Sequence, residues 1–208
     1  MGVLEQVRGL NRVWVRGNRA ANTVNGLDHV RLSGLNRIEF DGTSIDNVVE
    51  LGEGAWLQSL RIRFFGRRSK VILAPNCRWK GYILVYGNGR TVRIGERSTC
   101  IETYIVCRDR NVTIGSDCMF SRGIEIRSTD VHPIYDRATN ERINPAADVV
   151  VGDHVWVAAN TTLSKGSVIP DGCVVGAMSF VNRAFDAPNC VIAGSPARVV
   201  RDNIRWER

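Results

Sequence analysis

The sequence predicts an all-β fold, a solenoid in which short parallel strands stack coil upon coil. Two observations predict it: aliphatic residues recur at a stride of six, and a row of small or β-branched residues follows them at the same stride. On an α-helix a stride of six advances by ~600°, so its members would point in widely different directions. In an extended chain an even stride keeps every member on one face. Short strands separated by turns therefore explain both rows.

The two rows are clearest between residues 151 and 181. The aliphatic row contains Val151, Val157, Leu163, Ile169, Val175 and Val181. The small-residue row contains Val155, Thr161, Ser167, Cys173 and Ser179. Residues that tolerate turns follow several aliphatics directly, as at Gly152, Pro170 and Gly176. Each hexad thus predicts one short strand, with an inward aliphatic side chain, and one corner.

The same pattern recurs upstream with slips. Units begin at Leu51, Leu73, Ile94 and Ile114, which are 22, 21 and 20 residues apart. This spacing is close to three hexads plus a few corner residues, and such a repeat is the signature of a hexapeptide-repeat solenoid. Residues 1–50 alternate but keep the stride poorly. They predict a strand-rich opening coil or cap before a parallel β-helix over residues 51–195.

The stretch STDVHPIYDR, Ser128 to Arg137, interrupts the aliphatic row. After Ile126 the next core position would be residue 132, yet the row resumes at Val151. The sequence therefore predicts an inserted loop over about residues 132–150, with His132 at its root. A loop of this length in a compact domain is usually functional or disordered.

The tail ARVVRDNIRWER predicts a short C-terminal helix within residues 196–208. Its apolar residues Val199, Val200 and Ile204 would lie on one side of that helix. The helix would cap the open end of the solenoid, whose unpaired edge would otherwise favour aggregation.

Composition and charge narrow the class of protein. The chain has 208 residues, a net charge of +7 and six cysteines without a C-x-x-C pair, so neither a zinc ribbon nor a redox motif is indicated. We expect most of these cysteines to be reduced core residues and expect no metal. Basic residues occur in short scattered clusters, which argues against a nucleic-acid partner. The opening residues lack a signal-peptide core and no run suits a transmembrane segment, so we predict a cytoplasmic protein.

Three stretches resemble the hexapeptide-repeat acyltransferases. They are STDVHPIYD, VVVGDHVWVAANTTLSKGSVIPDGCVVGAMSFVN and NCVIAGSPARVVR. The match is similar in particular to galactoside and maltose O-acetyltransferases and to the O-acetyltransferases of polysaccharide assembly. This resemblance implies a left-handed parallel β-helix, a homotrimer with active sites between neighbouring subunits, and acetyl-CoA as the acetyl donor.

The resemblance also implies roles for single residues. His132 matches the family's catalytic histidine, and an ordinary imidazole titrates near pH ~6.5, as a base for a hydroxyl proton should. Asp130 and Glu125 lie near it in sequence and could orient its ring, as could a backbone carbonyl, although each carboxylate also fits a solvated charge. No nucleophile motif is visible, so we expect direct attack by the acceptor hydroxyl.

Further matches concern the donor. Ala159 and Ala177 match positions whose small size lets the pantetheine arm lie against the coils. Trp156 could form a wall of the acyl pocket or simply pack between subunits. Three arginines match basic positions near the adenosine and phosphate end: Arg183, Arg198 and Arg201. An asparagine that holds the acceptor in sugar acetyltransferases has no clear match, so the acceptor stays open.

The predicted function is an acetyl-CoA-dependent O-acetyltransferase that acts on a sugar or glycan precursor, with His132 as general base. An N-acyltransferase acting on an amino sugar or an antibiotic would use the same fold and donor. A γ-type carbonic anhydrase shares the β-helix but needs three zinc-bound histidines, for which this chain offers His29, His132 and His154. A solenoid that serves only as a non-catalytic scaffold is the fourth possibility.

Overall fold

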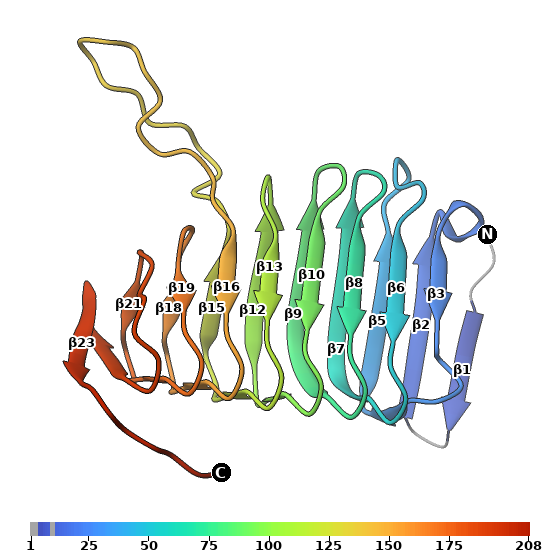
Figure 1. Ribbon diagram of the computed structural model, residues 1–208. Coiled ribbons are helices and arrows are strands. Elements are labelled where there is room, and N and C mark those ends of the chain that lie inside the picture. Colours follow the sequence, from blue (N-terminus) through green and yellow to red (C-terminus); the bar gives the residue numbers. More distant parts are fainter. Residues whose placement is uncertain (1–3, 9–10) are drawn as a thin grey trace.

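The computed structural model describes residues 4–8 and 11–208, with side chains from residue 12 onward, and confirms an all-β parallel solenoid. The coils stack along one axis from the N-terminal to the C-terminal end (Figure 1). Every pairing between coils is parallel. Antiparallel pairs among the described strands occur at the two ends, where β1 (Leu4–Arg8) pairs with β2 and β23 (Ala197–Arg201) pairs with β22.

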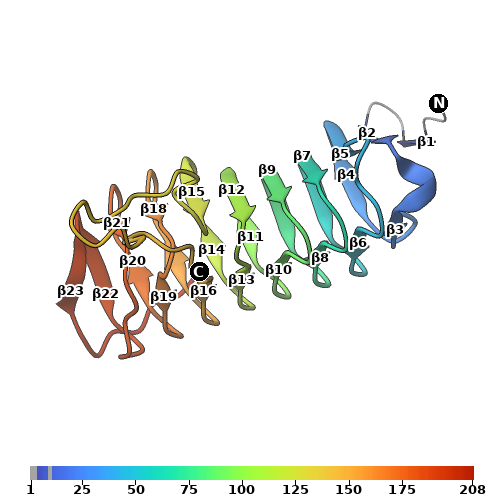
Figure 2. The same cartoon turned by 90° about the horizontal axis from the view of Figure 1, so that it is seen from above.

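Each coil runs across three faces, which succeed one another along the chain (Figure 2). Face 1 contains β4 (Arg31–Ser33), β11 (Thr99–Cys100), β14 (Met119–Phe120), β17 (Trp156–Val157), β20 (Val174–Val175) and β22 (Val191–Gly194). Face 2 contains β2 (Asn11–Gly17), β5 (Leu35–Phe40), β12 (Thr103–Arg108), β15 (Ile124–Arg127), β18 (Thr162–Leu163) and β21 (Phe180–Val181). Two long strands, β7 (Trp56–Phe65) and β9 (Arg78–Tyr86), begin on face 1 and continue onto face 2.

Face 3 forms a separate seven-stranded sheet. It contains β3 (Thr23–Asn25), β6 (Val48–Leu51), β8 (Lys70–Leu73), β10 (Thr91–Ile94), β13 (Val112–Ile114), β16 (Val149–Val151) and β19 (Val168–Ile169). A short 3-10 turn, η1 (Arg19–Ala21), precedes β3.

The predicted rows line the interior. All six aliphatics from Val151 to Val181 are at most 1% exposed, and Thr161 and Ser167 of the second row are fully buried. The Thr161 hydroxyl donates to the carbonyl oxygens of Ala158 and Gly176, at 2.9 and 3.1 Å. Small residues recur there because each corner turns its carbonyl groups inward, where only a short side chain fits and can satisfy them.

Residues 11–50 form coils that continue the same core. Val13, Val15, Ile38 and Phe40 are at most 2% exposed, and β5 pairs in parallel register with β7. The domain boundaries at residues 50 and 195 stay predictions.

The aliphatic row is interrupted between β15 and β16. Residues 128–148 carry an isolated antiparallel bridge between Tyr135 and Arg142, and this segment projects away from the coils (Figure 1). Its two ends rejoin the solenoid on successive faces, because β15 lies on face 2 and β16 on face 3.

The predicted C-terminal helix over 196–208 is wrong. Residues 197–201 form β23, and residues 202–208 have no helical turn. β22 would leave an unpaired edge at the end of the sheet, and a β-branched pair, Val199 and Val200, suits a strand that covers it.

The six cysteines are free and buried, which confirms the expectation of reduced core residues. Burial raises the pKa of the Cys77, Cys100 and Cys107 thiols to about 12, so they are poor nucleophiles. No helix of the described residues has the length and hydropathy that a membrane crossing requires.

Candidate active site

The root of the projecting loop has a backbone conformation that β-branched residues rarely adopt. Val131 has a φ of 70°, and the His132 N–H donates to the Asp130 carbonyl oxygen at 2.8 Å. A hydrogen bond that encloses one residue of positive φ defines a strained γ-turn. Strain of this kind costs about 1–3 kcal/mol and persists only where the surroundings hold it. Contacts around the turn must therefore fix the position of His132.

Asn144 provides these contacts from the returning end of the loop. Its Oδ1 accepts from the Ile134 N–H at 2.6 Å, and its Nδ2 donates to the Asp130 carboxylate and the His132 carbonyl oxygen, each at 2.9 Å. Asn144 is 6% exposed, so each of these bonds is expensive to lose. One amide thus joins both ends of the loop at the histidine.

Lys165, in the corner between β18 and β19, fastens the loop to the next coil. Its Nζ lies 2.8 Å from Oδ2 of Asp130. Burial raises the pKa of Asp130, but the hydrogen bonds from Lys165 and Asn144 outweigh it and hold the pKa below its usual value. Asp130 is therefore a charged anchor of the loop root.

The predicted catalytic residues have different surroundings. His132 is exposed at the loop root. Glu125 lies on the outer side of β15, where its carboxylate pairs with Arg127, and the Asp130 carboxylate bonds to Asn144 and Lys165. Neither carboxylate bonds to the His132 ring among the described residues, and their orienting role stays a prediction.

Trp156 opens β17 on face 1 and borders a cavity of about 570 Å³ together with Met119 and Arg208. The C-terminal tail folds back beside it. The Trp206 ring stacks on His154 with centroids 4.1 Å apart, and Arg208 donates to the Cys118 carbonyl oxygen at 2.8 Å. The tail therefore forms one wall of the cavity that Trp156 lines.

The residues predicted to bind the donor gather toward the C-terminal end. Trp156 and Val174 are register partners, so Ala159 and Ala177 occupy equivalent corners of successive coils. Ala159 is half-buried and Ala177 exposed. Three exposed arginines lie in the last coil or on β23: Arg183, Arg198 and Arg201. Ala159 and Ala177 lie at the corner from face 1 to face 2, whereas Arg183 lies at the corner from face 2 to face 3, so one chain does not place this arginine at the alanine corners.

One chain does not bring His132 and Trp156 together. His132 follows β15 at the corner that leads from face 2 to face 3, whereas Trp156 begins the next face 1 strand. A site that needs both side chains would have to take them from two chains.

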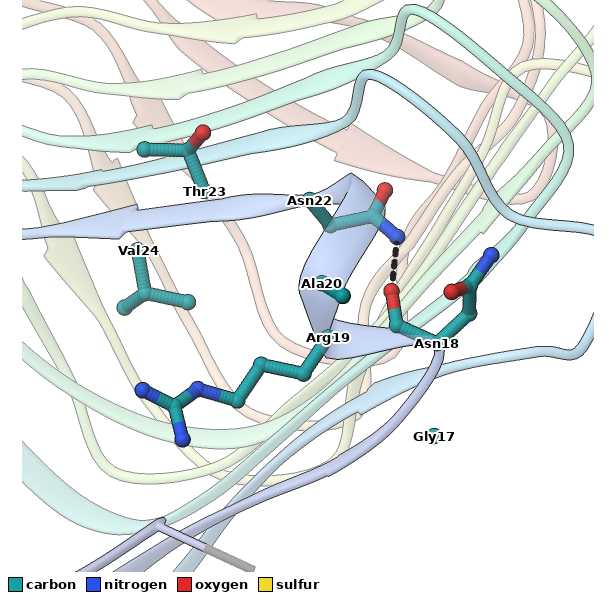
Figure 3. A pocket seen from close by; sticks show the side chains of 7 residues that line it. All are labelled: Gly17, Asn18, Arg19, Ala20, Asn22, Thr23 and Val24. Atoms are coloured by element: carbon teal, nitrogen blue, oxygen red, sulfur yellow. Dashed lines mark hydrogen bonds between the residues drawn. The ribbon is translucent and has the colours of Figure 1, made fainter. Parts of the chain in front are cut away.

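Two larger cavities lie elsewhere. One of about 760 Å³ lies beside Tyr82, Tyr104 and Glu125. The other, of about 630 Å³, surrounds η1 on the first coil, where the Asn22 side chain donates to the Asn18 carbonyl oxygen at 2.5 Å (Figure 3). Arg19 is the only ionisable side chain among its described lining residues, so this cavity offers no acid–base pair.

Sequence reasoning missed Asn144 and Lys165. The sequence offers one signal for Asn144: it lies directly before Pro145, at the end of the polar stretch of the loop. Lys165 lies 35 residues beyond Asp130 in sequence, and only the coil register brings the two side chains together. Among the described residues, no three metal-ligating side chains cluster.

Comparisons with known proteins give consistent relatives. No protein-family profile matches the chain. It is 36% identical to a polysialic acid O-acetyltransferase of Neisseria meningitidis over 90% of this chain and 86% of that protein. It is 37% identical to a polysialic acid O-acetyltransferase of Escherichia coli over 66% of this chain, but the match spans only 45% of that protein.

Solved structures agree. The crystal structure of the polySia specific acetyltransferase NeuO matches with a TM-score of 0.84 and 32% identity, over 94% of this chain and 88% of that one. The polysialic acid O-acetyltransferase OatWY matches with a TM-score of 0.81 and 34% identity, over 93% and 90%.

Proposed function

Because the chain belongs to the hexapeptide-repeat O-acetyltransferases and is therefore an acyltransferase, we propose that it moves an acetyl group from acetyl-CoA to a hydroxyl of an acidic glycan. The names of the relatives that cover most of the chain support polysialic acid, or a polymer like it, as the acceptor. The observation that carries the proposal is the loop root, where a fastened γ-turn presents an exposed histidine.

Acetyl-CoA would supply the acetyl group as a thioester, with its arm along Ala159 and Ala177 and its phosphates near Arg183, Arg198 and Arg201. His132 would accept the proton of the acceptor hydroxyl through a ring nitrogen as that oxygen attacks the thioester carbonyl carbon. The C–S bond would then break, and the imidazolium would return the proton to the departing CoA thiolate, which leaves as CoA. A positioned base of this kind contributes about 10²- to 10⁴-fold in rate. The fixed loop root supports this role, because Asn144 holds the His132 carbonyl, the Ile134 N–H and the Asp130 carboxylate.

Transfer to α2,8-linked polysialic acid tests the proposal. Purified protein, acetyl-CoA and the polymer should yield an acetylated polymer. Mild alkali should release its acetyl groups, because these conditions cleave an ester but not an amide. His132→Ala should lower kcat by at least about 100-fold without weakening the binding of CoA in calorimetry. His29→Ala is the matched control, since His29 is an exposed histidine paired with Asp28 on a distant coil. Full activity in His132→Ala would refute the general-base role.

The proposed assembly is a homotrimer of left-handed β-helices, located in the cytoplasm, where acetyl-CoA is available. The active site would combine His132 of one chain with Trp156 of the next, because the two lie on different faces of one chain. Complementation tests this. His132→Ala and Trp156→Ala chains, each inactive alone, should regain activity when they are unfolded and refolded together. In a random cyclic assembly about one site in four would combine a chain that keeps His132 with a neighbour that keeps Trp156. No recovery in mixed oligomers would argue for sites within single chains.

A further inference from the structure

A strip of arginines and aromatic rings runs along the outside of face 2, away from the donor residues. It occupies outward-facing positions of β2, β5, β7, β9 and β12, which alternate with buried positions, as in the pattern of β5. We call it the arginine–aromatic strip, with Trp14, Arg16, Arg37, Arg63, Tyr86 and Arg108 as its principal members. The proposed transfer reaction assigns these residues no role.

The strip is built from columns of register partners. Trp14, Arg37, Arg61 and Tyr82 follow one another on successive strands, and Tyr104 continues the column. Strands lie ~4.8 Å apart, so neighbouring guanidinium groups repel one another unless an anion lies between them. The column is therefore a linear array of positive charge and flat rings.

Acidic residues neutralise this array only in part. On the outward-facing positions of β5 and β7 the one carboxylate is Glu39, whose Oε2 lies 2.6 Å from Nη2 of Arg61. Glu39 is also the register partner of Arg16 on one side and of Arg63 on the other. Asp41 attracts Arg63, and Nε of Arg108 lies 3.8 Å from Oδ2 of Asp109. Five arginines against three nearby carboxylates leave this surface with a net positive charge, which favours an anionic ligand.

The guanidinium groups are pre-organised but not saturated. Arg16 lies over Trp14 at 4.1 Å, Arg63 over Phe65 at 4.4 Å and Arg108 over Tyr86 at 4.5 Å. A guanidinium that stacks on a ring keeps its edge N–H groups available for a bidentate contact with a carboxylate. Arg37 and Arg108 also each retain a buried Nε–H with no acceptor among the described residues. Because these Nε–H groups are buried, contacts with a ligand fall to the terminal Nη groups of the two side chains.

The strip leads to the root of the projecting loop. β2, β5, β7, β9, β12 and β15 follow one another along the solenoid (Figure 2). Five steps of ~4.8 Å separate β2 from β15, a span of about 24 Å. Thr129, just before the loop root, donates to the carboxylate of Asp109, which follows Arg108. A linear polymer lying on the strip would thus reach His132 with one end.

We propose that the arginine–aromatic strip binds an anionic polysaccharide that carries a carboxylate on each sugar, several sugars away from the residue that is acetylated. This inference rests on the proposed function and adds a docking surface to it. Arginines bind the carboxylates, and the exposed parts of the rings contact the apolar faces of the sugars. Tyr82 stacks on Tyr104 with ring centroids 5.4 Å apart, so the faces that these two rings turn toward each other contact neither a base nor a sugar, and competition with a single-stranded oligonucleotide distinguishes the two kinds of polymer.

Direct binding without donor tests the strip separately from transfer. The variant Arg16→Gln/Arg63→Gln removes two strip charges, and Lys70→Gln/Arg93→Gln removes two charges from exposed positions of face 3. We expect the strip variant to bind long α2,8-linked polysialic acid at least about 10-fold more weakly, and the face 3 variant to change less than about 3-fold, with the difference shrinking as salt rises. If the double variant does not fold, Arg16→Gln alone, at an exposed position, should still weaken the binding of the polymer, by a smaller factor.

Transfer kinetics provide the second readout. The strip variant should raise KM for long polymer while leaving kcat, and KM for a short oligomer that cannot reach the strip, unchanged. Equal weakening in the two double variants, equal binding of carboxyl-reduced polymer, tighter binding of a single-stranded oligonucleotide, or a changed oligomeric state in the strip variant would each overturn the inference. Absence of acetyl transfer by a wild-type protein that binds polymer through the strip would refute the proposed function alone.

Discussion

The N-terminal and C-terminal coils stack in the same way but differ in how they turn their corners. Between β17 and β21 each face carries a two-residue strand, and each corner is a separate turn. In β7 and β9, strands of 10 and 9 residues continue from face 1 onto face 2. At that corner Ser59 is an extra residue in a bulge opposite Gly81, and both have positive φ.

This difference also separates what the two regions expose. The outward positions of the two-residue strands β17 to β21 carry uncharged residues: Trp156, Thr162, Val168, Val174 and Phe180. Continuous strands present a broader outer surface, which here carries arginines and aromatic rings. One fold thus carries the corners proposed to bind the donor at one end and the arginine–aromatic strip at the other.

The corner glycines give the largest expected effect. In Gly81→Ala the new Cβ would lie 2.0 Å from the Thr103 carbonyl oxygen, at a φ of 128°. In Gly166→Ala the φ is 76° and the nearest neighbour, the Ala147 Cβ, lies 3.7 Å away. We expect Gly81→Ala to lower the free energy of unfolding by about 2–5 kcal/mol, from backbone strain plus overlap, and Gly166→Ala by about 1–2 kcal/mol, from strain alone. Urea unfolding of both variants measures this, and equal losses would mean that the long-strand corner is as tolerant as the turn.

The bulge explains which part of the fold the sequence could predict. Where every corner is a separate turn, one aliphatic in six marks the interior, and residues 151–181 are predictable by stride alone. At β7 the extra Ser59 shifts the register by one residue and turns the stride of six into a slip. No local feature of GAWLQSLRIRFF marks that bulge, so the sequence predicted this coil as part of the β-helix but not the continuous strand that turns its corner.

The candidate site, too, contains residues that the sequence could predict and residues that it could not. His132 was predictable because it lies where the stride fails, and the tail was not, because Val199 and Val200 suit one side of a helix as well as a strand. Asn144 and Lys165 act through contacts between distant parts of the chain. The spacing of residues along the sequence does not show such contacts, because they depend on how the coils and the loop pack in space.

The loop root gives the second expected effect, on catalysis more than on stability. Asn144→Ala removes the hydrogen bonds that join the Ile134 and His132 backbone to the Asp130 carboxylate. We expect kcat to fall about 10- to 100-fold through misplacement of His132, while CoA binding and the unfolding of the coils change little. Asn140→Gly is the control, since Asn140 is exposed in the same loop and already has positive φ. An equal fall of kcat in both variants would mean that general loop order, and not this amide, positions the histidine.

The smallest expected effect is a pH dependence confined to the loop root. The folded pKa of Asp130 lies below its usual value, so its contribution to stability is complete above the unfolded pKa of ~3.9 and is lost as pH falls through the folded pKa. The Asp130 side chain is 36% exposed, and solvent therefore limits this contribution to about 1 kcal/mol or less. The difference in unfolding free energy between wild type and Asp130→Asn should be present at pH 6 and shrink toward pH 2.5. The Arg16→Gln/Arg63→Gln variant leaves Asp130 in place, and Arg63 is only the smallest of the causes that hold the pKa of Asp41 below its usual value, so its difference from wild type should have a much smaller slope over this range. A slope in the strip variant as large as that in Asp130→Asn would show that the two regions share an acidic anchor, against the separation argued here.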